Sequence, residues 1–213
     1  MKPERGPVTI AVTGPLASGK STFVEMLGDF GAETVSADEI VHQLLAEDEE
    51  TVESVVQRFG EAVRSEGGGI DRKALGGEVF GDPEALQDLE EILHPRVREE
   101  VDRRAAASDA NLFAAEIPLL FEGEGADKYD MAVAVTAPKE RRWTWAEERG
   151  MEEEQLQAIE DRQLSGEEKA RRADVVVEND GDLHNMREHA RALVDRVLDE
   201  KEPSGERGAE EEA

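Results

Sequence analysis

Short runs of apolar, largely β-branched residues alternate along this chain with longer segments in which apolar residues recur every three or four positions. The short runs predict strands at residues 8 to 13, 33 to 36, 111 to 117, 131 to 136 and 175 to 178. Each run is bounded by turn residues or by a helical pattern. Strands that alternate with helices predict an α/β domain with a parallel sheet flanked by helices.

Helical periodicity covers most of the remaining chain. Residues 21 to 30 form one predicted helix, and a second begins after the strand at 33 to 36, with Asp38 as its expected cap. The stretch from 52 to 106 is polar and helical, with expected breaks at Gly67-Gly68-Gly69, Asp82-Pro83 and Pro95. A charged helical segment spans 139 to 172. Residues 183 to 198 predict an amphipathic helix with apolar Leu183, Met186, Ala190, Leu193, Val194 and Val197.

These patterns predict one domain over residues 1 to 199. Its core would comprise about 8 to 45, 108 to 138 and 173 to 199, with a helical insertion over about 46 to 107 and a helical lid over about 139 to 172. Residues 200 to 213 are polar and acidic. We expect this tail to be disordered, because it has too few apolar side chains to offset the loss of chain entropy.

Composition narrows the possible partners and the compartment. The 213 residues carry a formal net charge of -27 at pH 7, and such a field repels nucleic acid and anionic lipid. No apolar stretch approaches the roughly 20 residues needed to cross a bilayer. Cysteine is absent, which excludes disulfides and thiolate metal sites and fits a reducing compartment. We expect a cytoplasmic monomer with no nucleic-acid or membrane partner.

The segment between the first predicted strand and the first predicted helix carries the most specific motif. Gly14-Pro15-Leu16-Ala17-Ser18-Gly19-Lys20-Ser21 fits the phosphate-binding pattern G-x-x-x-x-G-K-S/T in the setting that this P-loop requires. Loop amides and the helix N-terminus bind phosphates, Lys20 neutralises their charge, and Ser21 offers its hydroxyl to Mg²⁺. The predicted ATP-binding residues of this segment are Gly14, Ala17, Ser18, Gly19, Lys20, Ser21 and Thr22.

Further motifs follow in a fixed order. They are Ala11-Val-Thr-Gly14 leading into Ser18-Gly-Lys-Ser-Thr22, Ser36-Ala-Asp38-Glu-Ile40, Leu93-His-Pro95, Glu116-Ile-Pro-Leu-Leu-Phe-Glu122, Gln163, and Ala173-Asp174 through Asn179-Asp-Gly181. Over roughly Val8 to Leu198 their order and spacing resemble those of the dephospho-CoA kinase family. The resemblance implies a P-loop NTPase fold and transfer of the ATP γ-phosphate to the ribose 3′-hydroxyl of dephospho-CoA, giving coenzyme A and ADP. The alternatives are another small-molecule P-loop kinase, of nucleoside or nucleotide type, or a nucleotide-binding protein without catalysis.

The resemblance also assigns the acceptor side of the site. It puts Asp38 beside the acceptor hydroxyl, where a carboxylate can orient that hydroxyl and accept its proton. The competing role of Asp38 is that of a helix cap, and the two roles are compatible. His94 would contact the acceptor, although a His-Pro pair in a helical stretch also serves to shape a kink. Gln163 matches a family position near the phosphates and is a further candidate for substrate binding.

On the nucleotide side, the resemblance points to Arg149 and Asn179. Arg149 would bind the phosphates, and the turn that begins at Asn179 would face the adenine ring. Glu116 ends a buried strand, where many P-loop proteins place a carboxylate that holds Mg²⁺ through water. Ser21 and Glu116 are therefore the candidate Mg²⁺ residues, with MgATP as co-substrate.

The chain departs from the family in the loop and in the lid. The family usually has glycine at the positions of Pro15 and Ala17. Because Pro15 lacks a backbone N–H and Ala17 does not easily adopt a positive φ, we expect a stiffer loop. A family arginine expected four or five residues before Arg149 is absent, and Arg141 and Arg142 are the candidates to take its place.

Overall fold

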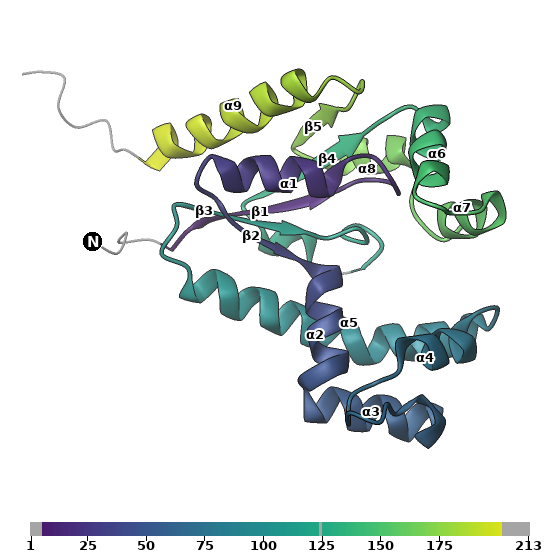
Figure 1. The fold of residues 1–213 in the computed structure, drawn as a ribbon. Coiled ribbons are helices and arrows are strands. Elements are labelled where there is room, and N and C mark those ends of the chain that lie inside the picture. Colours follow the sequence, from purple (N-terminus) through teal and green to yellow (C-terminus); the bar gives the residue numbers. More distant parts are fainter. Residues whose placement is uncertain (1–5, 124, 202–213) are drawn as a thin grey trace, which may run out of the picture.

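The sheet has five strands, all parallel (Figure 1). The computed structural model describes residues 6 to 123 and 125 to 201. The strands are β1 (Val8–Thr13), β2 (Glu33–Ser36), β3 (Leu112–Glu116), β4 (Met131–Thr136) and β5 (Val175–Glu178), in the order β2-β3-β1-β4-β5. The α/β class and the five strands are confirmed, each with bounds within one residue of the prediction.

Helices make the connections between the strands. Helix α1 (Lys20–Asp29) follows β1 along the chain, and helix α2 (Ala37–Glu47) follows β2. The segment before β3 contains α3 (Glu49–Phe59), the 3-10 turn η1 (Glu61–Val63), α4 (Arg72–Val79) and α5 (Pro83–Ala107). A second 3-10 turn, η2 (Ala126–Lys128), precedes β4. The segment between β4 and β5 contains α6 (Lys139–Glu148), α7 (Glu153–Glu160) and α8 (Gly166–Arg172), and α9 (Leu183–Lys201) follows β5.

The register of the central strands places their carboxyl ends side by side. Glu116, at the end of β3, lies opposite Val12 of β1 and opposite Ser36 of β2. The P-loop, helix α2 and the segment after β3 therefore begin at one level of the same sheet edge. Ligands of open α/β sheets bind at this edge, so the topology brings the candidate residues of three separate motifs together.

Each face of the sheet is covered by a different set of helices. In Figure 1, α1 and α9 lie together on one face, and α5 lies on the other. The core under α1 and α9 includes Ile10, Val12, Phe23, Leu27, Val133, Met186 and Leu193. On the opposite face, Val35 and Phe113 of the sheet pack against Ile40 of α2 and Val101 of α5. Burial on both faces accounts for the largely apolar sequences of the central strands β1, β3 and β4, whereas the edge strands β2 and β5 are partly exposed.

The expected helix break at Pro95 is wrong. Helix α5 runs for 25 residues, about 37 Å, with Pro95 inside it. On the N-terminal side of this proline, Leu93 packs into a separate core formed with α3 and α4. On the C-terminal side, Val101 packs against the sheet. Because both halves are fixed by tertiary packing, the helix tolerates the one backbone hydrogen bond that proline removes.

Two predictions about helix ends also need correction. Asp38 does not cap α2, because Ser36 occupies the N-cap position and Asp38 lies in the first turn. Its charge there still interacts favourably with the helix dipole. Leu183, expected on the apolar face of α9, is the first residue of that helix and is 59% exposed. Helix α9 extends to Lys201, and the rest of the predicted tail, 202 to 213, lies outside the described residues.

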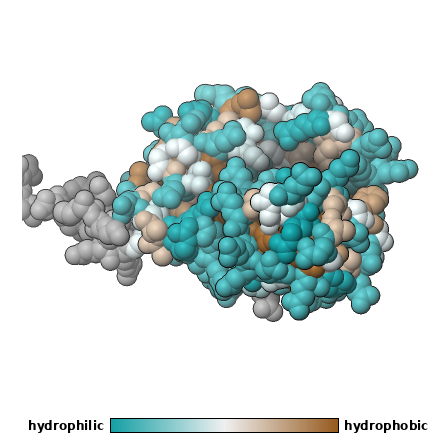
Figure 2. Space-filling view, turned by 60° about the horizontal axis from the view of Figure 1, so that its bottom comes forward, coloured by the Kyte–Doolittle hydropathy of each residue, from teal (hydrophilic) through white to brown (hydrophobic). Residues whose placement is uncertain are grey.

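The surface agrees with the acidic composition. Hydrophilic residues cover most of the face shown in Figure 2, with small hydrophobic areas between them. Within residues 6 to 123 and 125 to 201, no helix has both the length and the apolar character that crossing a bilayer requires.

Candidate active site

The P-loop lies so close to its neighbours that two of its glycines have no substitute. A Cβ atom on Gly14 would lie 2.1 Å from the carbonyl oxygen of Val135 in β4. A Cβ on Gly19, whose φ is +95°, would lie 2.5 Å from Nδ2 of Asn179. The loop is thus packed between β4 and the turn after β5, and its backbone shape depends on both.

Ala17 is held in the left-handed conformation, with φ of 56°. The loop therefore keeps its curve with an alanine in a conformation that alanine does not easily adopt. Hydrogen bonds to the residues on each side hold this geometry: Nη1 of Arg142 donates to the Leu16 carbonyl at 3.0 Å, and Nδ2 of Asn179 donates to the Ser18 carbonyl at 2.9 Å. The conformation costs an alanine about 1 kcal/mol, so part of the stability of the fold maintains the shape of the loop.

Lys20 is buried beneath the loop. Its Nζ donates to the carbonyl oxygens of Gly14 at 3.1 Å and Pro15 at 3.0 Å. Burial lowers the pKa of Lys20 to about 8, and the negative charge of Glu116 partly opposes this shift. The ammonium group therefore lies inside the curve of the loop, where a phosphate would be bound, and is poorly solvated without one.

Ser21 and Glu116 are in direct contact, although 95 positions separate them. Oγ of Ser21 donates to Oε1 of Glu116 at 3.0 Å. Glu116 is 8% exposed, and burial raises its pKa, while the hydrogen bond from Ser21 and the charge of Lys20 act in the opposite direction. A hydroxyl and a carboxylate at this distance are hard oxygen donors of the kind that Mg²⁺ takes together with phosphate oxygens. The donor set fits the predicted ion.

Asp38 lines a cavity of about 450 Å³ between α2, α5 and the segment after β3. His94 of α5 lines the same cavity and is half-buried, so these two predicted acceptor residues are brought together. The apolar part of the lining includes Val41, Leu86, Leu89, Leu93, Val97 and Tyr129. Asp38 is exposed, and its negative charge raises the pKa of both Lys20 and Glu116. The carboxylate of Asp38 thus faces the cavity and acts electrostatically on the P-loop.

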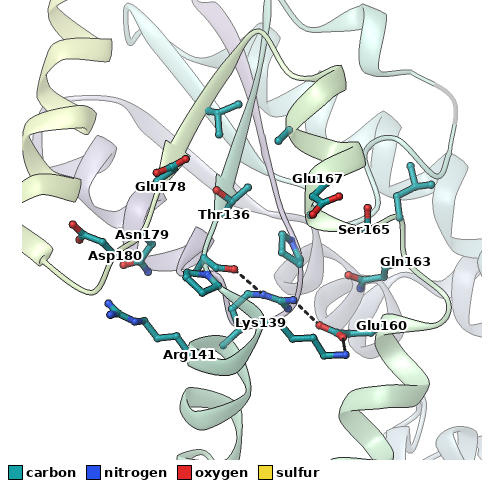
Figure 3. A pocket seen from close by; sticks show the side chains of 18 of the residues that line it. Thr136, Lys139, Arg141, Glu160, Gln163, Ser165, Glu167, Glu178, Asn179 and Asp180 are labelled. Atoms are coloured by element: carbon teal, nitrogen blue, oxygen red, sulfur yellow. Dashed lines mark hydrogen bonds and ion pairs between the residues drawn. The ribbon is translucent and has the colours of Figure 1, made fainter.

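A larger cavity of about 840 Å³ lies on the other side of the P-loop, bounded by the ends of β4 and β5 and by α6, α7 and α8. Figure 3 shows Arg141, Asn179 and Asp180 on one side of it and Glu160 and Gln163 on the other. Asn179 lines this cavity, but its side chain is buried and bonded to the backbone of Ser18 and Gly181, so its ATP-binding role stays a prediction. Gln163 lines this cavity and not the one that Asp38 and His94 share, so the three predicted substrate residues do not form one group.

The sequence profile of the dephospho-CoA kinase family matches residues 8–185. The chain belongs to this family. Proteins named dephospho-CoA kinase include one from Syntrophotalea carbinolica, 34% identical over 90% of this chain and 92% of its own length. Another, from Mesorhizobium japonicum, is 37% identical over 95% of this chain and 100% of its own length.

Solved structures agree with the family assignment. A crystal structure of a Thermus thermophilus protein is 35% identical and superposes with a TM-score of 0.77 over 90% of this chain and 98% of its own. The dephospho-CoA kinase from Campylobacter jejuni is 28% identical, with a TM-score of 0.62 over 90% of this chain and 97% of its own. A shikimate kinase from Acinetobacter baumannii, 16% identical with a TM-score of 0.53 over 92% of this chain and 96% of its own, shares the fold.

Arg141 and Arg142, the two candidates to replace the arginine expected before Arg149, lie in different surroundings. Arg142 is buried, with contacts to the carbonyls of Ala137 and Leu16 and an ion pair with Glu160 at 2.7 Å. Arg141 lines the larger cavity (Figure 3). Arg142 of α6 therefore connects Glu160 of α7 to the P-loop, and Arg141 is the more accessible of the two.

Other lid cations divide into exposed and buried groups. Arg149 is exposed at the C-terminal end of α6 and is not among the residues that line the larger cavity, so its ATP-binding role stays a prediction. Arg171 and Arg172 pair with Glu168 of their own helix. Sequence reasoning missed Lys169, whose side chain is 0% exposed, because a lysine in a charged helical segment gives no sign of burial.

Proposed function

We propose that the protein transfers the γ-phosphoryl group of MgATP to the ribose 3′-hydroxyl of dephospho-CoA, the last step of coenzyme A synthesis. The observation that carries this proposal is the grouping at the carboxyl ends of three adjacent strands. Lys20 and Ser21 follow β1, Asp38 follows β2, and Glu116 ends β3. Pro15 of the P-loop lines a cavity with room for a nucleotide, and Asp38 lines a second cavity.

The nucleotide would bind with its phosphates on the amides of the P-loop and the N-terminus of α1. Lys20 would exchange its two carbonyl partners for phosphate oxygens and so neutralise charge that develops during transfer. Ser21 and Glu116 would hold Mg²⁺, which supplies further neutralisation of the phosphates. Asn179 and Gln163 line the cavity in which the rest of the nucleotide would lie.

The acceptor would enter the smaller cavity, with its 3′-hydroxyl beside Asp38. As the hydroxyl oxygen forms its bond to the γ-phosphorus, the bond from that phosphorus to the β–γ bridging oxygen breaks and ADP leaves. The hydroxyl proton passes to the Asp38 carboxylate, which is accessible for this purpose. His94 would contact the acceptor from the opposite wall.

Three further parts of the proposal rest on the sequence. The lack of cysteine among the 213 residues supports a cytoplasmic location. The strong negative charge supports a protein without nucleic-acid or membrane partners. We also propose that the enzyme acts as a monomer, since a net charge of -27 makes copies of the chain repel one another.

Replacing Asp38 by asparagine tests the catalytic part. The amide keeps the size of the side chain but cannot accept the proton, so kcat with dephospho-CoA should fall on the order of 10² to 10⁴ fold. The free energy of unfolding should change by less than about 1 kcal/mol, because only a first-turn charge is lost. Glu39→Gln, one position along the same helix, is the matched control and should keep its turnover. Near-normal turnover in Asp38→Asn would end the general-base assignment.

A further inference from the structure

Lys169 is a buried cation for which the proposed chemistry has no use. It lies in α8, and its side chain is 0% exposed. Its Nζ donates to the carbonyl oxygen of Pro118 at 2.6 Å and pairs with Oε1 of Glu122 at 2.9 Å. Burial lowers the pKa of Lys169, and the negative charge of Glu122 partly opposes this shift. Taking an ammonium group and its partner carboxylate out of water costs free energy even when the two are paired, so the position of Lys169 requires an explanation.

The partners of Lys169 belong to one short segment. Pro118 and Glu122 lie in the stretch that follows β3 and its Glu116. The Pro118 carbonyl also accepts a hydrogen bond from Oγ1 of Thr13, at the end of β1, at 3.1 Å. Thr13, which precedes the P-loop, and Lys169 of α8 therefore donate to the same carbonyl oxygen.

Lys169 does not hold this segment alone. The backbone N–H of Leu164, which precedes α8, donates to Oε1 of Glu122 at 2.9 Å. Nη1 of Arg172 donates to the Phe121 carbonyl at 3.2 Å. Helix α8 and its approach thus contact the segment at 118, 121 and 122, and Lys169 makes the most deeply buried of these contacts.

Helix α8 and the segment 118 to 122, which Lys169 connects, line different cavities. Gly166, Glu167 and Ala170 of α8 line the larger cavity, where the nucleotide would bind. Pro118, Leu119 and Leu120 line the smaller cavity, which holds Asp38. Lys169 lies between them and joins the wall of one cavity to the wall of the other. Its charge also lowers the pKa of Lys20, which places it within electrostatic reach of the P-loop.

We propose that Lys169 is a positioning residue that couples the two cavities, so that closure of α8 on the nucleotide fixes the 117 to 122 wall of the acceptor cavity. The proposal rests on the proposed function, since it assumes that the two cavities hold ATP and dephospho-CoA. Lys169 need not touch either substrate. Its effect passes through Pro118 and Glu122, and it links the binding of one substrate to the affinity for the other.

The test is the affinity for dephospho-CoA, measured by calorimetry with and without a saturating β,γ-imido analogue of ATP and Mg²⁺. In the wild type, the analogue should tighten dephospho-CoA binding at least fivefold, the lower end of typical coupling. Lys169→Met should reduce this ratio to less than twofold while its affinity for the analogue alone stays within threefold. Arg171→Met, on the same helix but exposed, is the matched control and should keep the wild-type ratio.

A structural role alone would lower the melting temperature without changing the ratio. If Lys169→Met does not fold, Glu122→Gln provides the second test: its amide oxygen still accepts from Leu164 and Lys169, but the opposing charge is gone, and the ratio should again fall. A wild-type ratio in either folded variant would overturn the proposal, as would a wild type whose ratio is already below twofold. A wild type that binds no dephospho-CoA would instead refute the proposed function, and this inference with it.

Discussion

Burial of the charged Lys20 side chain should lower the stability of the folded protein, and the size of this effect can be measured. The Lys20 ammonium is buried against two carbonyl oxygens, and burial lowers its pKa from 10.5 to about 8. Glu116 and Asp38 oppose this shift, whereas the positive charges of Lys169 and Arg142 add to it. In the unfolded chain the same group is solvated. The folded protein therefore binds the proton of Lys20 less tightly than the unfolded protein does.

The sign of the effect on stability follows from linkage. Below pH 8 both states carry the proton, and the full cost of burying the charge is present. Between about pH 8 and 10.5 the unfolded state binds more protons, so the free energy of unfolding rises with pH through this window. The two pKa values differ by about 2.5, and each pH unit is worth about 1.4 kcal/mol, so the total gain is about 3 kcal/mol.

Urea unfolding of the wild type and of Lys20→Met, at several pH values from 7 to 10, isolates this contribution. Methionine does not titrate, and the carbonyl oxygens that it leaves without Nζ cost the same at every pH. The stability of the wild type relative to Lys20→Met should therefore rise by about 2 to 3 kcal/mol between pH 7 and pH 10. Parallel curves, with a difference constant within about 0.5 kcal/mol, would refute the buried charge.

The same group should also appear in the kinetics of the wild type. The ratio kcat/KM for ATP reports on the free enzyme, so it should fall as pH rises through about 8, where Lys20 loses its proton. Bound phosphates favour the charged form, so kcat at saturating ATP should fall only at higher pH. Identical pH profiles for the two quantities would show that Lys20 does not respond to the phosphates.

Ala17 of the P-loop and Arg142, which contacts the loop, give two predictions about the stability of the protein. Ala17→Gly should raise the free energy of unfolding, measured by heat or urea, by up to about 1 kcal/mol, because the strain at φ of 56° is released. The control is Ala106→Gly in the last turn of α5, which should lower the free energy of unfolding by about 0.5 to 1 kcal/mol. A loss in Ala17→Gly would contradict the strain. Arg142→Met should cost about 2 kcal/mol, because the Leu16 and Ala137 carbonyls lose their donor and Glu160 keeps only Lys139 as an ion-pair partner. The exposed control Arg171→Met should stay within about 0.5 kcal/mol, and equal losses would remove the special role of Arg142.

The positions of the strands could be predicted from the sequence because the central strands are buried in the fold. In a parallel sheet covered on both faces, strands are continuous apolar runs, and glycines or charged helix starts mark their ends. The P-loop was equally clear, because its glycines are needed for close approach to Val135 and Asn179. Local chemistry therefore predicted both the class of fold and the phosphate site.

Contacts between distant residues could not be read from local patterns. The strand order places Ser21 beside Glu116, a pair that the sequence offered only as two separate candidates. Lys169 and Arg142 lie in a segment whose charge suggests a solvated helix, and only the packing of α6 and α8 against the P-loop and the segment after β3 buries them. Ser36, and not Asp38, occupies the N-cap position of α2, because β2 continues to the residue before the helix.

The identity of the acceptor distinguishes a dephospho-CoA kinase from the other small-molecule P-loop kinases. ADP release by the purified protein should be measured in parallel with dephospho-CoA, adenosine, AMP and shikimate, with Lys20→Met as the control for contaminating kinases and mass spectrometry of the product. We expect ADP release and a coenzyme A product only with dephospho-CoA, and background rates in Lys20→Met. Faster ADP release with adenosine, AMP or shikimate, or no release with any of the four, would contradict this expectation.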